Sequence, residues 1–473
     1  LTMGDLRLPP LLRALLGGAL AGLAPAAAGP LTLLPGLVLL WSVSRRPRLA
    51  ALWGGIAVLV SHRWLLGLHP LTWMGVPALL SLPIAVGLWL ICCAAAAGLL
   101  SVWSQLACWL DGRIRPLAQV LVLAVLWGLA EVGLSGSPLF WLGLGGSVLP
   151  IDPWLAALAQ WIGAGGLTVL LLLWAWLLCS RQLWPAVLSL ALAHGLGAWL
   201  LSQPVSSLGS LDLALWQPSI PTREKFSLEQ QRRFPAALQA ALDQAAAAQV
   251  SWLLAPEGTL PSSWRTALPD ASPLLLSGGF RQVRGQTRSS LLMLKPGGSS
   301  RPRPLSDKHR LVPLGEWMPS GLTAGLSAVG GLQPGSSSRL VDGLSPPLAL
   351  AICYEISHGH ALAEAAAQGG QWLLTLANLD PYPLQLQRQF LALSQLRAIE
   401  TGRDLVAVGN TGPTAVVRSD GSTEWLLPPG REGVAQTTIQ LHGRITPYSR
   451  WPDRPLLLML PLVLLLERVQ ASR

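Results

Sequence analysis

The sequence predicts a multi-span α-helical membrane bundle followed by a layered α/β domain. Two observations predict this division of the 473-residue chain. Residues 1–203 are almost continuously apolar, whereas residues 204–452 contain charged residues, glycine and proline between apolar runs of strand length. Charged residues make up only 12% of the chain, against about 25% in an ordinary globular protein. We therefore expect a membrane protein that carries a polar domain.

The first part contains about seven apolar segments, each near the ~20 residues that a bilayer-spanning helix needs. Arginines lie around the start of the first segment and after the second, fourth and sixth, so the positive-inside rule places the N-terminus in the cytoplasm. An odd number of spans delivers the following domain to the opposite side of the membrane. The segments run over residues 10–28, 30–44, 50–68, 76–103, 117–134, 155–179 and 183–202.

In the second part, predicted strands alternate with helices, which indicates a layered α/β or α+β domain. Apolar runs of strand length occur near residues 249–255, 273–280, 290–295, 347–352, 371–377 and 404–409. Helical patterns lie near residues 235–248, 357–368 and 385–401, and residues 411–427 predict a hairpin.

A last apolar run, Pro455 to Leu466, lies within residues 453–473 and ends at Glu467-Arg468. We expect a C-terminal membrane helix there, followed by a short cytoplasmic tail. Because the run is short for a full span, a buried helix or a re-entrant segment is the alternative.

Composition excludes several classes of protein. The net charge is +10, but the charges flank apolar segments and form no basic stripe with aromatic residues, which favours an anionic membrane surface over nucleic acid. The five cysteines have no spacing typical of a disulfide framework, and no CxxC motif or His/Cys cluster indicates zinc. We expect no metal, no organic cofactor and no nucleic-acid partner.

Cys353 is the one cysteine that lies in the polar part of the chain. It ends an apolar, strand-like run, where a thiol can be exposed and held rigidly, as a nucleophile must be. Glu257 follows another such run, which Pro256 is expected to end, and Lys308 lies in a loop between them in sequence. If the two strands are neighbours in one sheet, their ends share an edge and the side chains can meet in one cleft.

These three residue types fit acyl transfer through a thioester. The carboxylate can take the proton of the thiol, and the ammonium can lower the thiol pKa and stabilise the oxyanion of a tetrahedral intermediate. Each residue alone is more often structural: Glu257 as a solvated turn residue, Lys308 as part of a charged loop, and Cys353 as a packed thiol. Their order and their positions at strand ends together favour the catalytic interpretation.

Three segments carry a resemblance to a known family. Ala255-Pro-Glu-Gly258, Asp307-Lys-His-Arg-Leu-Val-Pro-Leu-Gly-Glu316 and Ile352-Cys-Tyr-Glu355 resemble the Glu-Lys-Cys signature of the nitrilase superfamily. The long lysine motif behind a bundle of membrane spans is similar to one branch in particular, the apolipoprotein N-acyltransferases. The resemblance covers nearly the whole chain and implies a nitrilase-like αββα sandwich for residues 204–452.

By this resemblance, Glu257 is the general base, Lys308 stabilises the oxyanion and Cys353 is the nucleophile. The resemblance also implies supporting or substrate-contacting roles for Glu316, Tyr354, Glu355, Phe226 and Asn378. The chain departs from the family pattern in two places. Phe226 stands where the family commonly has tryptophan, and residues 377–382 keep Asn378 but not the aromatic and glycine pattern. These departures affect fine substrate contacts more than the chemistry.

The resemblance implies a ping-pong enzyme of the bacterial cytoplasmic (inner) membrane, with its catalytic domain on the periplasmic side. A membrane phospholipid would donate a fatty acyl group to Cys353, and the N-terminal amine of a diacylglyceryl apolipoprotein would accept it. No cofactor is implied, and a monomer is expected to suffice. Two alternatives are a membrane-tethered nitrilase-like amidase that gives the thioester to water, and a non-catalytic membrane protein that binds lipid or protein.

Overall fold

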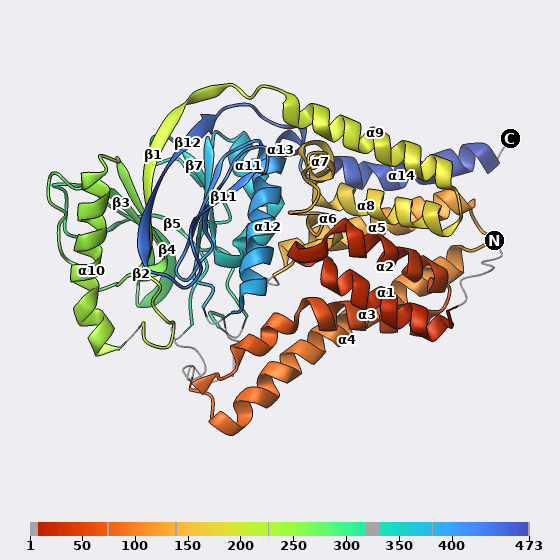
Figure 1. Cartoon of the computed structure of the whole chain (residues 1–473), viewed down its shortest axis with the longest axis horizontal. Coiled ribbons are helices and arrows are strands. Elements are labelled where there is room, and N and C mark those ends of the chain that lie inside the picture. The colour runs from red at the N-terminus through yellow and green to blue at the C-terminus, as the bar shows by residue number, and fades with distance from the viewer. Residues whose placement is uncertain are drawn as a thin grey trace.

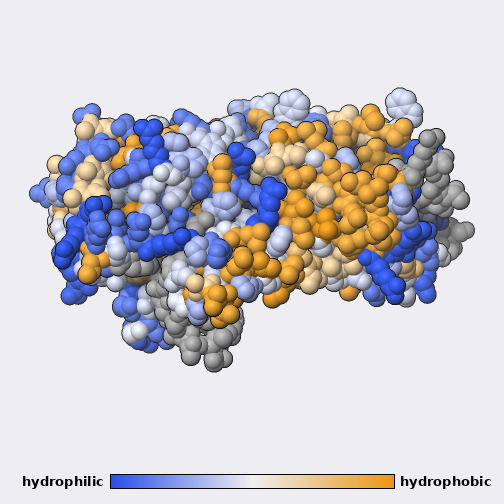
Figure 2. Space-filling view, turned by 60° about the horizontal axis from the view of Figure 1, so that its bottom comes forward, coloured by the Kyte–Doolittle hydropathy of each residue, from blue (hydrophilic) through white to orange (hydrophobic). Residues whose placement is uncertain are grey.

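The computed structural model describes residues 8–72, 75–137, 140–225, 227–313, 315–317, 331–380 and 382–471. A bundle of helices and a sandwich of two sheets lie side by side along the long axis of the molecule (Figure 1). Figure 2 shows that hydrophobic side chains cover much of the visible face of the helical part, whereas hydrophilic side chains dominate the sandwich. The surface therefore divides as the composition of the chain predicts.

A helix occupies each of the seven predicted apolar segments. Within the described residues, five helical stretches are long and apolar enough to cross a membrane, and α2 and α3 are shorter apolar helices. Helices α1, α2, α3 and α5 each begin at a proline, whose fixed φ suits the first turn of a helix. The main helices are α1 (Pro10–Leu23, continued by the π-helical turn Ala24–Ala28), α2 (Pro30–Val43), α3 (Pro47–Ser61), α4 (Ala78–Leu110), α5 (Pro116–Gly136), α8 (Ala159–Cys179) and α9 (Leu183–Ser202). Short turns of helix lie between them: η2 (Arg63–Leu68), α6 (Gly143–Gly146) and α7 (Pro153–Ala156).

The described strands form two six-stranded sheets. The first sheet has the order β12-β1-β2-β3-β4-β5, with β1, β2 and β3 parallel to one another. Its strands are β1 (Ser207–Gln217), β2 (Trp252–Leu260), β3 (Leu274–Val283), β4 (Gln286–Leu294), β5 (Arg303–Asp307) and β12 (Gly433–His442). The second sheet has the order β11-β10-β9-β8-β7-β6, with β7, β8 and β9 parallel. Its strands are β6 (Leu340–Val341), β7 (Leu348–Ile352), β8 (Trp372–Ala377), β9 (Leu405–Gly409), β10 (Thr414–Val417) and β11 (Thr423–Leu427).

The two sheets face each other, and helices cover both outer faces (Figure 1). Helix α10 (Leu228–Ala247) covers the first sheet, while α11 (Gly359–Ala367) and α12 (Leu384–Thr401) cover the second. Alternation along β1 explains the layers, because Ala214 and Trp216 share a core with α10 whereas Leu213 and Leu215 belong to the core between the sheets. The predicted fold class, a helical membrane bundle with an αββα sandwich, is confirmed.

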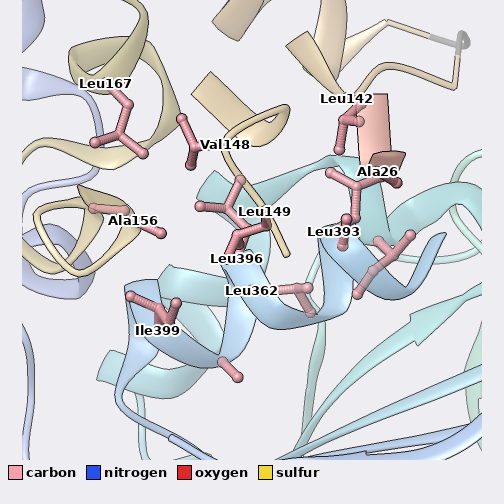
Figure 3. Packing of buried hydrophobic residues seen from close by; sticks show 14 of the residues in the cluster. Ala26, Leu142, Val148, Leu149, Ala156, Leu167, Leu362, Leu393, Leu396 and Ile399 are labelled. Atoms are coloured by element: carbon pink, nitrogen blue, oxygen red, sulfur yellow. The ribbon is translucent and has the colours of Figure 1, made fainter. Parts of the chain in front are cut away.

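Helix α12 lies between the second sheet and the bundle, and almost all of its side chains are buried. Figure 3 shows Leu393 and Leu396 of α12 beside Leu142 and Leu149 of the bundle. A helix that is covered on all sides needs no polar face, but its polar residues then need partners. Gln389 supplies one such contact, donating to the carbonyl oxygen of Ser61 at the end of α3 over 3.3 Å. The bundle and the sandwich therefore share one continuous core.

The chain returns to the bundle after β12. The short helix α13 (Pro447–Arg450) leads into α14 (Arg454–Ala471), a single 18-residue helix that contacts α5 and α8. This helix extends the predicted apolar run Pro455 to Leu466 by about one turn at its C-terminal end.

Candidate active site

Glu257 lies inside β2, so the expectation that Pro256 ends the strand is wrong. The pairing of β2 with β3 is interrupted: Ala255 pairs with Ser277 and Leu260 with Gly279, so residues 256–259 lie opposite the single residue Gly278. A Cβ on Gly278 would lie 2.5 Å from the Cα of Glu257, which explains why a glycine is needed opposite the bulge. A bulge of this kind re-aims a side chain, here the carboxylate of Glu257.

Cys353 follows β7 directly and opens the short helical turn η5 (Cys353–Ser357). Its φ is +56°, in the left-handed region, where a non-glycine residue costs about 1–3 kcal/mol. The residue is only 8% exposed. Strain of this type occurs where the surrounding structure holds a residue in one orientation, which is what a nucleophile requires.

The two residues meet for a reason different from the one the sequence suggested. Strand β2 belongs to the first sheet and β7 to the second. The condition that the two strands are neighbours in one sheet is therefore not met. The stacking of the sheets brings Glu257 and Cys353 close enough for the charge of Glu257 to raise the pKa of the Cys353 thiol. The site therefore lies between the sheets.

Lys308 follows β5 and is completely buried. Its ammonium donates hydrogen bonds to Oε1 of Glu257 over 2.8 Å and to Oε1 of Glu316 over 2.7 Å. Burial alone would lower the pKa of Lys308, but the charges of the two carboxylates outweigh burial and raise this pKa well above its ordinary value. Lys308 therefore stays protonated and can stabilise an oxyanion.

Burial also raises the pKa of the Cys353 thiol, and the charge of Glu257 raises it further, while Lys308 lowers it. The net direction is upward, so the resting thiol is neutral. Lys308 thus lowers the thiol pKa as expected, but burial and the charge of Glu257 outweigh this effect. A neutral thiol needs a base at the moment of attack, and Glu257 is placed for that task.

Glu316, Tyr354 and Glu355 shape the surroundings of the lysine. Glu316 accepts from the main-chain nitrogen of Val312 over 2.9 Å, which closes the loop after Lys308. The hydroxyl of Tyr354 donates to the carbonyl oxygen of Leu311 over 2.6 Å. The ring of Tyr354 lies 5.6 Å from the Lys308 ammonium. Glu316 and Tyr354 therefore both hold the backbone of the loop that follows Lys308.

Glu355 organises the backbone on both sides of the site. Its buried carboxylate accepts from the main-chain nitrogens of His309 (2.8 Å), Arg310 (3.0 Å) and Ile352 (2.9 Å). Arg339, which sequence reasoning missed, pairs with the same carboxylate over 3.0 Å. Glu355 therefore ties the lysine loop to the turn that carries Cys353.

Asn378 reaches the site through its backbone. Its main-chain nitrogen donates to Oε2 of Glu257 over 3.3 Å, while its side chain donates to Oγ1 of Thr222 and accepts from Nδ2 of Asn410, each over 3.0 Å. The side chain thus contacts the loop after β1. Phe226, the other predicted contact residue, lies outside the described residues.

Asp307, beside the lysine, is expected to stabilise the fold in a pH-dependent way. Its carboxylate accepts from Arg281, Arg288 and Ser290 over 2.6–2.9 Å. Burial raises its pKa, but these hydrogen bonds outweigh burial and lower the pKa from 3.8 to about 2. We expect Asp307→Asn to lower the free energy of unfolding by about 1–3 kcal/mol at pH 7.

Because the pKa of Asp307 is lower in the folded state than in the unfolded state, ionisation of this carboxylate stabilises the folded protein. The stability difference from the unchanged protein should be complete above about pH 5 and should shrink as the pH falls through 3.8 toward 2. Denaturant titration in detergent measures it, with Asp342→Asn as the control at an exposed aspartate. A difference that does not change over this pH range contradicts the assignment.

In the part of the chain that the structure describes, no group of three or more His, Cys, Asp or Glu side chains is arranged to hold a metal ion. The chemistry available at the site is that of a buried thiol, two carboxylates and one ammonium.

Comparison with known proteins assigns the class first. The carbon-nitrogen hydrolase family model matches residues 235–446, the segment that contains Glu257, Lys308 and Cys353. An amidase from Nesterenkonia sp. of known structure is 17% identical, with a TM-score of 0.38 over 54% of this chain and 98% of that chain. The match of the family model identifies a carbon-nitrogen hydrolase domain within the polar part of the chain.

Relatives of full length assign the family. The chain is 60% identical to the apolipoprotein N-acyltransferase of Parasynechococcus marenigrum (strain WH8102), over 96% of this chain and 100% of that protein. It is 52% identical to the apolipoprotein N-acyltransferase of Prochlorococcus marinus (strain MIT 9313), over 96% of this chain and 95% of that protein. The chain belongs to the apolipoprotein N-acyltransferase family.

Proposed function

We propose that the chain transfers a fatty acyl group from a membrane phospholipid, through a thioester on Cys353, to the N-terminal amine of a diacylglyceryl apolipoprotein. Family membership makes the chain an N-acyltransferase whose acceptor is a lipoprotein. The observation that best supports the thioester route is the convergence of Glu257, Lys308 and Cys353 between the two sheets.

The first half-reaction forms the thioester. Glu257 takes the proton of the Cys353 thiol as the sulfur attacks the ester carbonyl of the donor. Lys308 stabilises the oxyanion of the tetrahedral intermediate. The carbon–oxygen bond of the ester then breaks, and the leaving lysophospholipid oxygen receives the proton from Glu257. The products are acyl-Cys353 and a lysophospholipid.

The second half-reaction uses the same groups. The α-amine of the acceptor attacks the thioester carbonyl and gives a proton to Glu257. The carbon–sulfur bond breaks as the intermediate collapses, an amide forms, and Glu257 returns the proton to the departing sulfur. The site is restored without a cofactor, and one copy of the chain supplies every group that these steps use.

An apolar cavity in the bundle supports a lipid donor. It has a volume of about 360 Å³, and its lining comes mainly from α3, α4, α5 and the segment after α5. Aromatic side chains connect this cavity to the site: Phe140 of its lining packs edge-on against Trp64, and Trp64 packs edge-on against Tyr382. Burial raises the pKa of Tyr382, and the charges of Cys353 and Glu316 raise it further while Lys308 lowers it, so Tyr382 belongs to the electrostatic surroundings of the site.

The charge pattern of the loops favours a cytoplasmic N-terminus, so the proposed catalytic domain faces the periplasm across the inner membrane. The proposed division of the chain is a membrane bundle over residues 1–203, a catalytic domain over 204–452, and a membrane helix with a short cytoplasmic tail over 453–473. The gap between α9 and β1 and the gap between α13 and α14 support these boundaries.

Purified protein in detergent micelles, given acyl-labelled phospholipid and a diacylglyceryl-cysteine peptide, should produce labelled N-acyl peptide and lysophospholipid in equal amounts. Chromatography with mass detection measures both products. Free fatty acid without acylated peptide would instead identify the membrane-tethered amidase. Lipid binding without either product would identify a non-catalytic protein.

A further inference from the structure

The bulge in β2 leaves the backbone of Glu257 outside the regular ladder of its sheet. Residues 256–259 oppose one residue of β3, so the main-chain groups of Glu257 cannot all pair with that strand. The carbonyl oxygen of Glu257 instead accepts a hydrogen bond from Nζ of Lys225 over 3.0 Å. A lysine from another element therefore replaces the missing strand partner.

Lys225 reaches this carbonyl from the loop between β1 and α10, and polar contacts hold that loop in place. The main-chain nitrogen of Thr222 donates to Oδ2 of Asp380 over 2.7 Å, and its hydroxyl donates to the carbonyl oxygen of Asp380 over 3.1 Å. Asn410 pairs with both main-chain groups of Ile220, over 2.7 and 3.1 Å. The loop therefore presents Lys225 to β2 from a fixed position.

The Lys225 ammonium also packs closely on the bulge. It lies 3.1 Å from the position that a Cβ on Gly258 would take, and Gly258 has a φ of +64°. Glycine meets both needs at this position, since it adopts the left-handed conformation easily and leaves room for the ammonium.

Lys225 is half-buried, and the loss of surrounding water makes this an unfavourable place for a positive charge. This loss of water lowers the pKa of Lys225 to about 8, although the charges of Glu257 and Asp380 act in the opposite direction. An ion pair of Lys225 could form at the exposed surface. A hydrogen bond from its ammonium to the carbonyl oxygen of Glu257 can form only at this partly buried position.

We propose that Lys225 is a positioning residue that fixes the bulged backbone of Glu257 and so sets the approach of its carboxylate to the Cys353 thiol. Glu257 is then held at three points: its carbonyl oxygen by Lys225, its Oε1 by Lys308, and its Oε2 by the main-chain nitrogen of Asn378. This inference rests on the proposed roles of Glu257 and Cys353. Lys225 touches none of the reacting atoms, so its loss should slow the chemical step without weakening donor binding.

A single-turnover experiment tests the proposal. The purified full chain is mixed with excess phospholipid, and formation of acyl-Cys353 is followed by intact-protein mass spectrometry. The final amount of acyl-Cys353 reports how much protein is folded, and its rate of formation reports the chemical step. Lys225→Met should keep the amplitude and the half-saturating donor concentration but acylate about 10- to 100-fold more slowly, the effect of a small misplacement of a catalytic group. Lys225→Arg, which keeps a charged donor, should stay within about threefold of the unchanged rate.

Lys295→Met is the matched control, because it makes the same change at an exposed lysine. A Lys225→Met rate within about twofold of the control, at normal amplitude, would overturn the proposal. If Lys225→Met yields too little folded protein, Lys225→Arg decides: a rate about tenfold or more below the control would also overturn it. Failure of the unchanged protein to form acyl-Cys353 would count against the proposed function itself. This outcome differs from a failure of the proposed role of Lys225, in which the unchanged protein does form acyl-Cys353.

Discussion

Cys353→Ser should abolish the acyl-enzyme and lower transfer to the acceptor peptide by roughly 10⁴-fold. A serine hydroxyl is far less acidic than a thiol, and burial already disfavours the charged form of the side chain at this position. Intact-protein mass spectrometry after incubation with phospholipid measures the acyl adduct directly. The unchanged protein should gain the mass of one acyl chain, and the serine variant none.

Cys108→Ser provides the control, since Cys108 is an exposed cysteine of α4. It should form the adduct at the unchanged rate. Transfer by Cys353→Ser at more than about 1% of the unchanged rate would mean that another group carries the acyl chain.

Glu257→Gln should slow formation of acyl-Cys353 by about 10²- to 10⁴-fold, the usual contribution of a general base. Glutamine has nearly the same shape as glutamate but cannot take a proton. Because the thiol pKa is raised in the resting site, the thiol does not ionise readily without this base. Single-turnover acylation at pH 7 measures the rate, and the final amplitude reports how much protein remains folded.

Glu316→Gln is the matched control, because it removes the same charge from the second partner of Lys308. Its effect on acylation should be at least tenfold smaller than that of Glu257→Gln, since proton transfer is lost only in the latter. Equal rates for the two variants would show that both changes slow acylation by removing a negative partner of the Lys308 ammonium, and not by removing a base. Acylation by Glu257→Gln at the unchanged rate would show that the base is another group.

The membrane bundle could be predicted from sequence because a bilayer imposes a simple rule of length and polarity. The length and polarity of the seven apolar segments can be read from the sequence without knowing how the helices pack. Strands β7, β8 and β9 of the second sheet could be predicted for a similar reason, because they are short, apolar and buried on both faces. Strand β12 was missed, since its Gln436-Thr-Thr438 stretch is polar and lies at the edge of its sheet, where one face meets solvent.

Glu257, Lys308 and Cys353 could be singled out because each stands near the end of an apolar run or in a long motif. Their arrangement could not be predicted, since strand pairing is non-local: neighbouring strands were expected, and two facing sheets were found. The bulge at Pro256 was likewise invisible, because it depends on the pairing of β2 with Gly278.

The residues that hold the site together left almost no signal in the sequence. Arg339 lies in a serine-rich stretch, and its role depends on reaching Glu355 16 positions later. Lys225 is one of several charged residues before α10, and only the fold brings it to the carbonyl oxygen of Glu257. Asn378 lies in a segment that otherwise departs from the family pattern, and the sequence does not show that its side chain contacts the loop after β1.

The fate of an isolated acyl-enzyme distinguishes acyl transfer to an amine from hydrolysis of the thioester. The unchanged protein is loaded with labelled phospholipid, freed of excess lipid, and mixed with a diacylglyceryl-cysteine peptide while the label on Cys353 is followed. The proposed function predicts that the label leaves Cys353 only as fast as it appears on the peptide amine, and that the rate rises with peptide concentration. Loss of the label to free fatty acid at a rate independent of the peptide would contradict it.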